Sequence, residues 1–185
     1  MGNFTFEKTA IEGLVIVHTK VFGDERGYFM ETYHEGSFDE AGYSYRFVQG
    51  NQSSSRRGVL RGLHFQVNHP QAKYVRVISG EVFDVAIDLR RSSQTYGKWV
   101  GVTLSAENKR GFLIPRGFAH GFVVTSDSAE FSYLCDDLYH PEDEGGIIWN
   151  DPGIGIDWPD VGPLTLSEKD QNRPTLRESR IAFDL

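Results

Sequence analysis

Pro115-Arg116-Gly117-Phe118-Ala119-His120 is the stretch from which the fold is predicted, because its proline and glycine form a tight turn into a strand that carries a histidine. A second histidine lies in Arg61-Gly62-Leu63-His64-Phe65-Gln66, a run typical of a strand. Gly62, His64 and Gln66 alternate and therefore share one face, where the glycine leaves space beside the histidine. Together the two stretches predict a β-sheet protein with both histidines on the wall of a pocket.

The spacing Pro-x-Gly-x-x-His resembles the second half of the pattern by which cupins, a class of small double-sheet barrels, hold a histidine inside the barrel. In metal-binding cupins the first half reads His-x-His followed by glutamate. Here Gln66 replaces the second histidine, and Pro70 and Gln71 stand where the glutamate is expected. Transition-metal sites normally need three or four protein ligands, so we expect no metal and no cofactor. Histidines in a cavity without a metal favour proton transfer.

Other functions are compatible with these residues. One is a metal-dependent enzyme of the same fold, with His64, His120 and Gln66 as ligands. Another is a sugar-binding module without turnover, for which a pocket rich in aromatic and arginine residues is enough. Each histidine is also compatible with a purely structural role, as a buried ring bonded to the backbone or as part of a turn.

The length and composition predict one globular domain over residues 1–185. A hydrophobic content of 39% is that of a globular protein, and no apolar run approaches the roughly 20 residues needed to span a bilayer. The first residues lack the profile of a signal peptide and Cys135 is the single cysteine, so we expect a cytoplasmic protein without an intrachain disulfide. The net charge of −7 argues against a nucleic-acid partner, although a few local Arg and Lys residues are enough to bind one phosphorylated small molecule.

Short runs of strand-forming residues separated by turn residues dominate the chain, which is typical of an all-β protein. We therefore predict a double-sheet jelly roll, a cupin-like barrel, with short peripheral helices. The expected helices are residues 37–41 and the segment after Ser167, where Ser-Glu-Lys-Asp resembles a capping box. The expected strands are residues 14–18, 28–33, 45–48, 59–66, 74–78, 82–89, 99–104, 111–114, 120–124 and 130–134.

Ser79-Gly80 lies between two of these strands and predicts a two-residue hairpin. Its register places Lys73, Val75, Val77, Val82, Asp84 and Ala86 on one face, and Tyr74, Arg76, Phe83, Val85 and Ile87 on the other. Lys73 then has Asp84 on the same face, a partner that a lysine on a barrel wall needs. Because both faces carry apolar residues, we expect one to line the barrel and the other to meet a second sheet or a partner subunit. A homodimer is the natural hypothesis.

Other candidate residues are less specific by their spacing alone. Tyr133 shares a strand face with Phe131, and most tyrosines in such positions belong to the core. Asp170 stands in the predicted capping segment, which favours a structural role. Residues 22–31 combine a turn with an arginine and aromatic side chains, a mixture suited to binding phosphate and stacking on a base. The chain contains no glycine-rich phosphate loop and no dinucleotide fingerprint.

Six motifs follow one another along the chain: Asp24-Glu25-Arg26-Gly27, Gln49-Gly50-Asn51, Val59-Leu60-Arg61-Gly62-Leu63-His64-Phe65-Gln66, Gly80-Glu81-Val82-Phe83-Asp84-Val85, Ile114-Pro115-Arg116-Gly117-Phe118-Ala119-His120-Gly121-Phe122 and Trp149-Asn150-Asp151. In this order they closely resemble the dTDP-4-dehydrorhamnose 3,5-epimerase family, over residues 22–170. The resemblance implies a homodimeric jelly roll that acts without a metal on dTDP-4-dehydro-6-deoxy-D-glucose in dTDP-L-rhamnose synthesis. Epimerisation at C3 or C5 alone, and isomerisation of a keto-sugar, are the alternatives on the same fold.

The resemblance also implies roles for individual residues. His64 is then the base that removes a proton beside the C4 ketone, Asp170 is its partner, and Tyr133 donates a proton on the opposite face of the sugar. Lys73 and His120 match residues that contact the sugar around the ketone, where Lys73 would stabilise an enolate oxyanion. The residues that match binders of the nucleotide-sugar are Arg26, Glu31, Gln49, Asn51, Arg61, Glu144 and Lys169.

Overall fold

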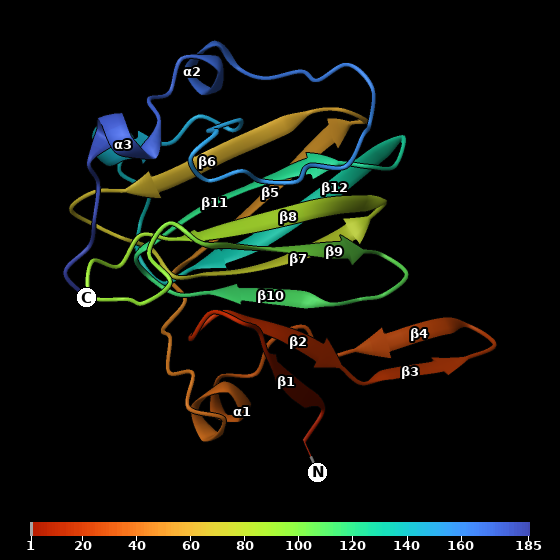
Figure 1. The fold of residues 1–185 in the computed structure, drawn as a ribbon. Helices are drawn as coiled ribbons and strands as arrows, with labels where there is room; N and C mark the ends of the chain where they lie inside the picture. Colours follow the sequence, from red (N-terminus) through yellow and green to blue (C-terminus); the bar gives the residue numbers. More distant parts are fainter. Residues whose placement is uncertain (1) are drawn as a thin grey trace.

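Two facing β-sheets form the body of the protein in the computed structural model, which describes residues 2–185 (Figure 1). The first sheet has six strands, in the order β1 (Phe4–Lys8), β2 (Val15–Thr19), β10 (Gly111–Ile114), β7 (Lys73–Ser79), β12 (Ser128–Cys135) and β5 (Gln49–Arg56). The second has five, in the order β13 (Glu144–Gly146), β6 (Leu60–Gln66), β11 (Phe118–Val124), β8 (Glu81–Asp88) and β9 (Trp99–Ser105). A separate ribbon of β3 (Val21–Asp24) and β4 (Gly27–Met30) extends away from both sheets (Figure 1). This is the double-sheet architecture that the sequence predicts.

The helices are short and lie at the periphery, as expected. α1 (Glu35–Glu40) covers most of the range predicted at 37–41. α2 (Glu168–Gln171) follows Ser167, whose side chain caps the helix by accepting a hydrogen bond from the Asp170 amide. α3 (Leu176–Ser179) and the short 3-10 helix η1 (Pro141–Asp143) have no counterpart in the prediction. No helix within residues 2–185 is long and apolar enough to cross a membrane.

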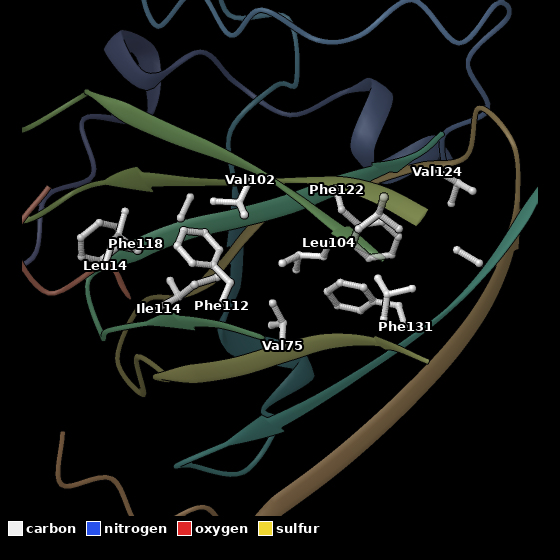
Figure 2. Close-up of a cluster of buried hydrophobic side chains, with 14 of the residues drawn as sticks. Leu14, Val75, Val102, Leu104, Phe112, Ile114, Phe118, Phe122, Val124 and Phe131 are labelled. Carbon is white, nitrogen blue, oxygen red and sulfur yellow. The ribbon is translucent and has the colours of Figure 1, made fainter. Parts of the chain in front are cut away.

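An apolar core fills much of the space between the two sheets (Figure 2). Alternate residues of β7 to β12 contribute to this core, because successive side chains of a strand point to opposite faces. The ring of Phe122 on β11 stacks on the ring of Phe131 on β12, with their centroids 4.1 Å apart, and so joins the two sheets. Figure 2 labels the core residues Leu14, Val75, Val102, Leu104, Phe112, Ile114, Phe118, Phe122, Val124 and Phe131.

The outer faces of the sheets are covered by segments near the two ends of the chain. On the five-stranded sheet, Val85 and Ile87 belong to a cluster with Phe183, against which Trp158 packs. On the six-stranded sheet, Tyr74 lies against Phe38 of α1, with their ring centroids 5.2 Å apart. One face of each strand lines the barrel, as predicted. On the other face, where a second sheet or a partner subunit is expected, segments of the same chain pack instead.

The predicted hairpin between β7 and β8 is wrong, because these strands belong to different sheets. β7 pairs with β10 along one edge and with β12 along the other, so it has no free edge for β8. The turn at Ser79-Gly80 instead carries the chain to the facing sheet, where the Glu81 amide donates to Ser126 Oγ at 2.7 Å. The predicted grouping by face is nevertheless correct, because valines assigned to the inner face of both strands meet in the core.

The strand expected at residues 45–48 is also wrong, since the strand in this region is β5, which begins at Gln49. The sequence of β5, Gln-Gly-Asn-Gln-Ser-Ser-Ser-Arg, has little intrinsic preference for a strand, yet all of it pairs with β12. Tertiary pairing overrides local preference here. Tyr45 and Phe47, which suggested a strand, join the aromatic cluster around α1 instead. The sequence patterns also do not predict β1, β3 and β13. The strand expected at residues 28–33 corresponds to β4, which ends earlier, at Met30.

Truncation of a core side chain should destabilise the protein strongly. Leu104 is fully buried, so Leu104→Ala should lower the free energy of unfolding by about 2–5 kcal/mol, through lost burial and the cavity left behind. Leu185 is 59% exposed, and Leu185→Ala is a matched control. The control should change stability by no more than about 0.5 kcal/mol. Urea unfolding followed by tryptophan fluorescence measures both variants, and equal effects would contradict the assignment of the core.

Candidate active site

Part of the space between the sheets is left open as a cavity of about 700 Å³. Its walls come from β6 and β11 of one sheet and from β5, β7 and β12 of the other, together with β13 and α2. All predicted site residues except Arg26 and Glu31 line this cavity: Gln49, Asn51, Arg61, His64, Lys73, His120, Tyr133, Glu144, Lys169 and Asp170. The fold thus brings together polar residues from segments far apart in the sequence.

His64 and Asp170 form a hydrogen-bonded dyad. His64 Nε2 lies 2.6 Å from Asp170 Oδ1. Because an ionised carboxylate only accepts, Nε2 carries the hydrogen and Nδ1 is left as the basic nitrogen of the ring. The Gly62 amide donates to Asp170 Oδ2 at 3.3 Å and holds the aspartate from a second side. Asp170 also keeps its predicted capping position, since its own amide donates to Ser167 Oγ at 3.1 Å while its side chain contacts the histidine.

The environment of Asp170 favours its ionised form. The residue is buried, and burial alone would raise the pKa of its carboxyl. Hydrogen bonds involving His64, Gly62 and Ser167 outweigh this effect, so the pKa of Asp170 lies below its usual value. An ionised aspartate fixes the tautomer of the histidine and stabilises the imidazolium that forms when the ring takes up a proton. The dyad therefore has the arrangement of a general base and its orienting partner.

A second histidine–aspartate pair lies beside the first. His120 is the neighbour of His64 across the β11–β6 pairing, and its Nε2 lies 2.9 and 3.0 Å from the two carboxylate oxygens of Asp84. Asp84 is fully buried, which raises the pKa of its carboxyl, while His120 and Lys73 oppose that shift. The two strands come so close that a Cβ on Gly62 would lie 2.6 Å from the backbone of β11. Glycine at this position therefore permits the approach of the two histidine-bearing strands.

Lys73 and Tyr133 belong to the other sheet and line the same cavity. They lie on neighbouring strands, β7 and β12, where Lys73 pairs with Cys135, two residues beyond Tyr133. Burial lowers the pKa of Lys73, an effect that nearby negative groups such as Asp84 oppose. Burial raises the pKa of the Tyr133 hydroxyl, which therefore carries its proton at neutral pH. The two sheets thus present a candidate base and a candidate proton donor on different walls.

Glu144 connects three side chains at the cavity. Its carboxylate accepts a hydrogen bond from Tyr139 Oη at 2.8 Å, forms an ion pair with Arg173, and lies 3.5 Å from Lys169 Nζ. Burial would raise the pKa of Glu144, but the hydrogen bonds from Tyr139 and Arg173 and the nearby His64 lower it overall. Glu144 is therefore an ionised carboxylate that organises its neighbours.

Gln66 joins two loops beside the cavity. Its Nε2 donates to the carbonyls of His69 and Leu138 at 2.7 and 3.1 Å, and its Oε1 accepts from the His140 amide at 2.6 Å. Because both ends of its amide are bonded to the backbone, this arrangement disfavours the alternative in which Gln66 is a metal ligand. Within residues 2–185 no group of three or more His, Cys, Asp or Glu side chains is placed to hold a metal ion.

Arg26 and Glu31 lie outside the cavity of their own chain. Arg26 follows the end of β3 and forms an ion pair with Asp24, with 84% of its side chain exposed. Glu31 follows β4 and accepts a hydrogen bond from Asn3 Nδ2 at 2.6 Å. Because the β3–β4 ribbon extends away from the two sheets (Figure 1), these two predicted ligands are separate from the others within one chain.

Three features of the site are not identified by the sequence patterns. Asp84 is predicted on the inner face as a partner of Lys73, but its hydrogen bonds are to His120. Arg173 follows Asp170 by three residues, a spacing that brings side chains together on one face of a helix. This spacing is the one sequence feature that could have identified Arg173 as part of the site. Tyr139 lines the cavity from a loop without any periodic pattern.

The fold and the cavity define a small double-sheet barrel equipped for acid–base chemistry on a small molecule. The model of the dTDP-4-dehydrorhamnose 3,5-epimerase family matches residues 8–178, and the chain belongs to this family.

Individual relatives agree with this assignment. The dTDP-4-dehydrorhamnose 3,5-epimerase of Methanothermobacter thermautotrophicus is 57% identical over 183 residues, which cover 98% of this chain and 99% of the relative. That of Pseudomonas aeruginosa is 55% identical over 165 residues, with 89% and 91% covered. Among solved structures, the Legionella pneumophila dTDP-6-deoxy-D-glucose-3,5-epimerase in complex with dTDP-4-keto-L-rhamnose has a TM-score of 0.93 at 48% identity, with 97% of each chain covered. The family resemblance and the jelly-roll fold expected from the sequence are confirmed.

Loss of the Gln66 amide should loosen the loop that carries Tyr139. Gln66→Leu leaves two carbonyls and the His140 amide without their partner, at a cost of about 1–3 kcal/mol for a buried unsatisfied group. Hydrogen exchange at residues 138–140, measured by mass spectrometry, should therefore become at least about tenfold faster. Gln52→Leu is the control, because Gln52 is exposed on β5 and its side chain donates to Glu130 Oε2 at 3.3 Å, away from this loop. Unchanged exchange in Gln66→Leu would contradict this role.

Proposed function

We propose that the protein is an isomerase that inverts C3 and C5 of dTDP-4-dehydro-6-deoxy-D-glucose, the dTDP-4-dehydrorhamnose 3,5-epimerase reaction of dTDP-L-rhamnose synthesis. Membership of the family and the names of the relatives support this proposal. The observation that carries it is the placement of the His64–Asp170 dyad and of Tyr133 on walls from different sheets around one cavity. Inversion needs such a pair, because the proton leaves from one face of the carbon and another returns to the opposite face.

Proton removal is the first step of the proposed mechanism. Carbons C3 and C5 flank the C4 ketone, so loss of a proton from either gives an enolate whose charge gathers on the C4 oxygen. His64 Nδ1 takes the proton, and Asp170 stabilises the imidazolium. Lys73 stabilises the oxygen as the charge forms, and one such donor typically contributes roughly 3 kcal/mol. Burial lowers the pKa of Lys73, but the developing negative charge favours its protonated form.

Proton return is assigned to Tyr133. Burial raises the pKa of its hydroxyl, so the group enters the reaction protonated. Transfer of this proton to the face opposite His64 inverts the carbon and regenerates the ketone. The resulting tyrosinate takes a proton from solvent and the imidazolium releases one, which prepares both groups for the second carbon.

The remaining polar residues of the cavity are assigned to substrate binding. His120 contacts the sugar near its ketone, held in place by Asp84. Arg61 Nε donates to Ser55 Oγ at 3.1 Å, which orients a guanidinium suited to the diphosphate. Gln49, Asn51, Glu144 and Lys169 complete the proposed nucleotide-sugar site.

We also propose that the protein is a homodimer in which the β3–β4 ribbon of each protomer supplies Arg26 and Glu31 to the cavity of its partner. The ribbon exposes Phe22, Tyr28 and Phe29 by 43%, 60% and 68%, an apolar surface of the kind that binds another protein. β5, which contributes Gln49 and Asn51 to the cavity, is the last strand of its sheet. It therefore has one edge available to an added strand.

The proposed reaction incorporates two solvent hydrogens. In D2O, product formed from dTDP-4-dehydro-6-deoxy-D-glucose should carry one deuteron at C3 and one at C5, with the configuration of both carbons changed. Mass spectrometry counts the deuterons and NMR locates them. A product with a single deuteron would instead indicate a single-carbon epimerase.

His64→Ala distinguishes the enzyme from a sugar-binding module. The variant should lose deuterium exchange by about 10²- to 10⁴-fold, the usual contribution of a general base, while dTDP binding in calorimetry is retained. His18→Ala is the matched control, since His18 lies on β2 and pairs with Glu7 on the outside. Exchange that persists in His64→Ala would mean that another residue is the base.

If the β3–β4 ribbon forms the dimer interface, changes in it should alter both the mass of the protein in solution and its affinity for dTDP. Light scattering should give twice the mass of the 20.9 kDa chain. Phe29→Asp should shift the protein toward monomer and weaken dTDP binding, because a charge replaces an exposed apolar contact of the ribbon. Arg26→Ala should weaken dTDP binding while the mass stays dimeric. Leu185→Asp is the control, and a monomeric mass of the unmodified protein would overturn the proposal.

A further inference from the structure

Arg173 lies next to the His64–Asp170 dyad, in the segment between α2 and α3. Its Nη2 pairs with Glu144 Oε1, and its Nε lies 3.9 Å from Asp170 Oδ1, the oxygen that accepts from His64. Only 14% of the side chain is exposed. Nε is fully buried and has no hydrogen-bond partner among residues 2–185. An arginine in this setting is held there by charge and not by a complete set of hydrogen bonds.

The backbone around the dyad leaves space for this side chain. Gly146 on β13 pairs with His64 on β6, so it lies directly beside the proposed base in the sheet. A Cβ on Gly146 would lie 2.7 Å from Arg173 Nε and 2.8 Å from Cδ. Any other residue at this position would push the guanidinium away from the two carboxylates.

We propose that Arg173 is a positioning residue for the proton-abstracting base, which holds Asp170 and Glu144 in place and offsets the effect of their negative charges on the protonation of His64. The proposal deepens the proposed function and rests on it in one respect, the role of His64 as the base. Arg173 itself does not line the cavity.

The charges around His64 explain why such a residue is needed. Two carboxylates, Asp170 from α2 and Glu144 from β13, act on the ring, and both stabilise its protonated form. The other titratable or charged groups that face the cavity are Arg61 on β6, His120 on β11, Lys73 on β7, Tyr133 on β12, Lys169 on α2 and Tyr139. Arg173 is the cation that offsets these negative charges, because its guanidinium pairs with Glu144 and lies 3.9 Å from Asp170.

Arg173 is better placed to compensate than Lys169. The Lys169 side chain is 70% exposed, so solvent and salt screen its charge. The Arg173 side chain is mostly buried and lies between both carboxylates, where a charge acts through a lower effective dielectric constant. Its always protonated guanidinium supplies a positive charge that does not titrate with the dyad.

The test compares the pH dependence of kcat/KM in the unmodified enzyme, Arg173→Gln and Arg173→Lys. Removal of the charge should move the acid limb of the profile to higher pH by about one unit, because the dyad then takes up its proton at higher pH. At pH values below the acid limb, kcat/KM of Arg173→Gln should be about tenfold lower than that of the unmodified enzyme. At alkaline pH the two values should agree. Arg173→Lys retains a charge and should restore most of the original profile. Arg177→Gln removes an exposed arginine on α3 and should leave the profile unchanged.

A measurement on the unliganded protein separates this inference from the proposed function. NMR of ¹⁵N-labelled histidines, with His64 assigned by His64→Asn, records the pH at which the ring changes its protonation. If the His64 titration moves to higher pH in Arg173→Gln, the role of Arg173 is supported. This holds even if the protein has no epimerase activity and the proposed function is therefore wrong. A uniform loss of kcat/KM at every pH, an unchanged ring titration or a shift to lower pH would overturn the inference.

A second variant guards against a misfolded Arg173→Gln protein. Glu144→Gln removes one of the carboxylates that act on the ring, so the titration of His64 in the same NMR experiment should move to lower pH. A shift to higher pH in that variant would contradict the proposed charge balance. Circular dichroism melts identify which variants are folded.

Discussion

Strand β7 is hydrogen-bonded along both edges, and this constraint organises the fold and the cavity together. Because neither edge can pair with β8, the chain leaves the sheet at Ser79-Gly80 and continues in the facing one. The inner faces of β7 and β8 then face each other across the interior. Lys73 and Tyr133 consequently line one wall, and His64 and His120 line the other. A hairpin at the same turn would have kept both strands in one sheet and left no second wall.

Buried charges on these walls are paired, with one exception. Asp170 pairs with His64, Asp84 with His120 and Glu144 with Arg173, and removal of one partner would leave the other buried without compensation. Lys73 is half-buried without a direct ion pair among the residues that the structure describes, and burial lowers its pKa. In the proposed mechanism this lysine stabilises an oxyanion, and a permanent carboxylate partner would compete with the charge that forms during the reaction.

The sequence predicts which face of a strand a side chain occupies, because this depends only on local alternation. It does not predict contacts that depend on where other strands lie. The predicted inner-face positions of Lys73 and Asp84 are correct although the predicted hairpin is wrong, since alternation within each strand survives the change of sheet. β5 has no strand signal of its own, because its order comes from β12. Asp170 and His64 are 106 residues apart, and the local pattern around Asp170 indicates only a helix cap. The family resemblance supplies that pair, and nothing in the spacing supplies the ion pair of Arg173 with Glu144.

Core and cavity are built on the same strand faces, so packing and stereochemistry are connected. On β12, Phe131 belongs to the core and Tyr133 follows two residues later on the cavity wall. On β11, Phe122 belongs to the core and His120 precedes it by two residues. The stacked rings of Phe122 and Phe131 join these strands at a centroid distance of 4.1 Å. Since a close-packed core is stiff, this contact fixes how far apart the two walls stand. In the proposed mechanism a substrate carbon has to reach His64 on one wall and Tyr133 on the other. The width of the cavity must then match the sugar ring, and the packing of the core beside it helps to hold that width.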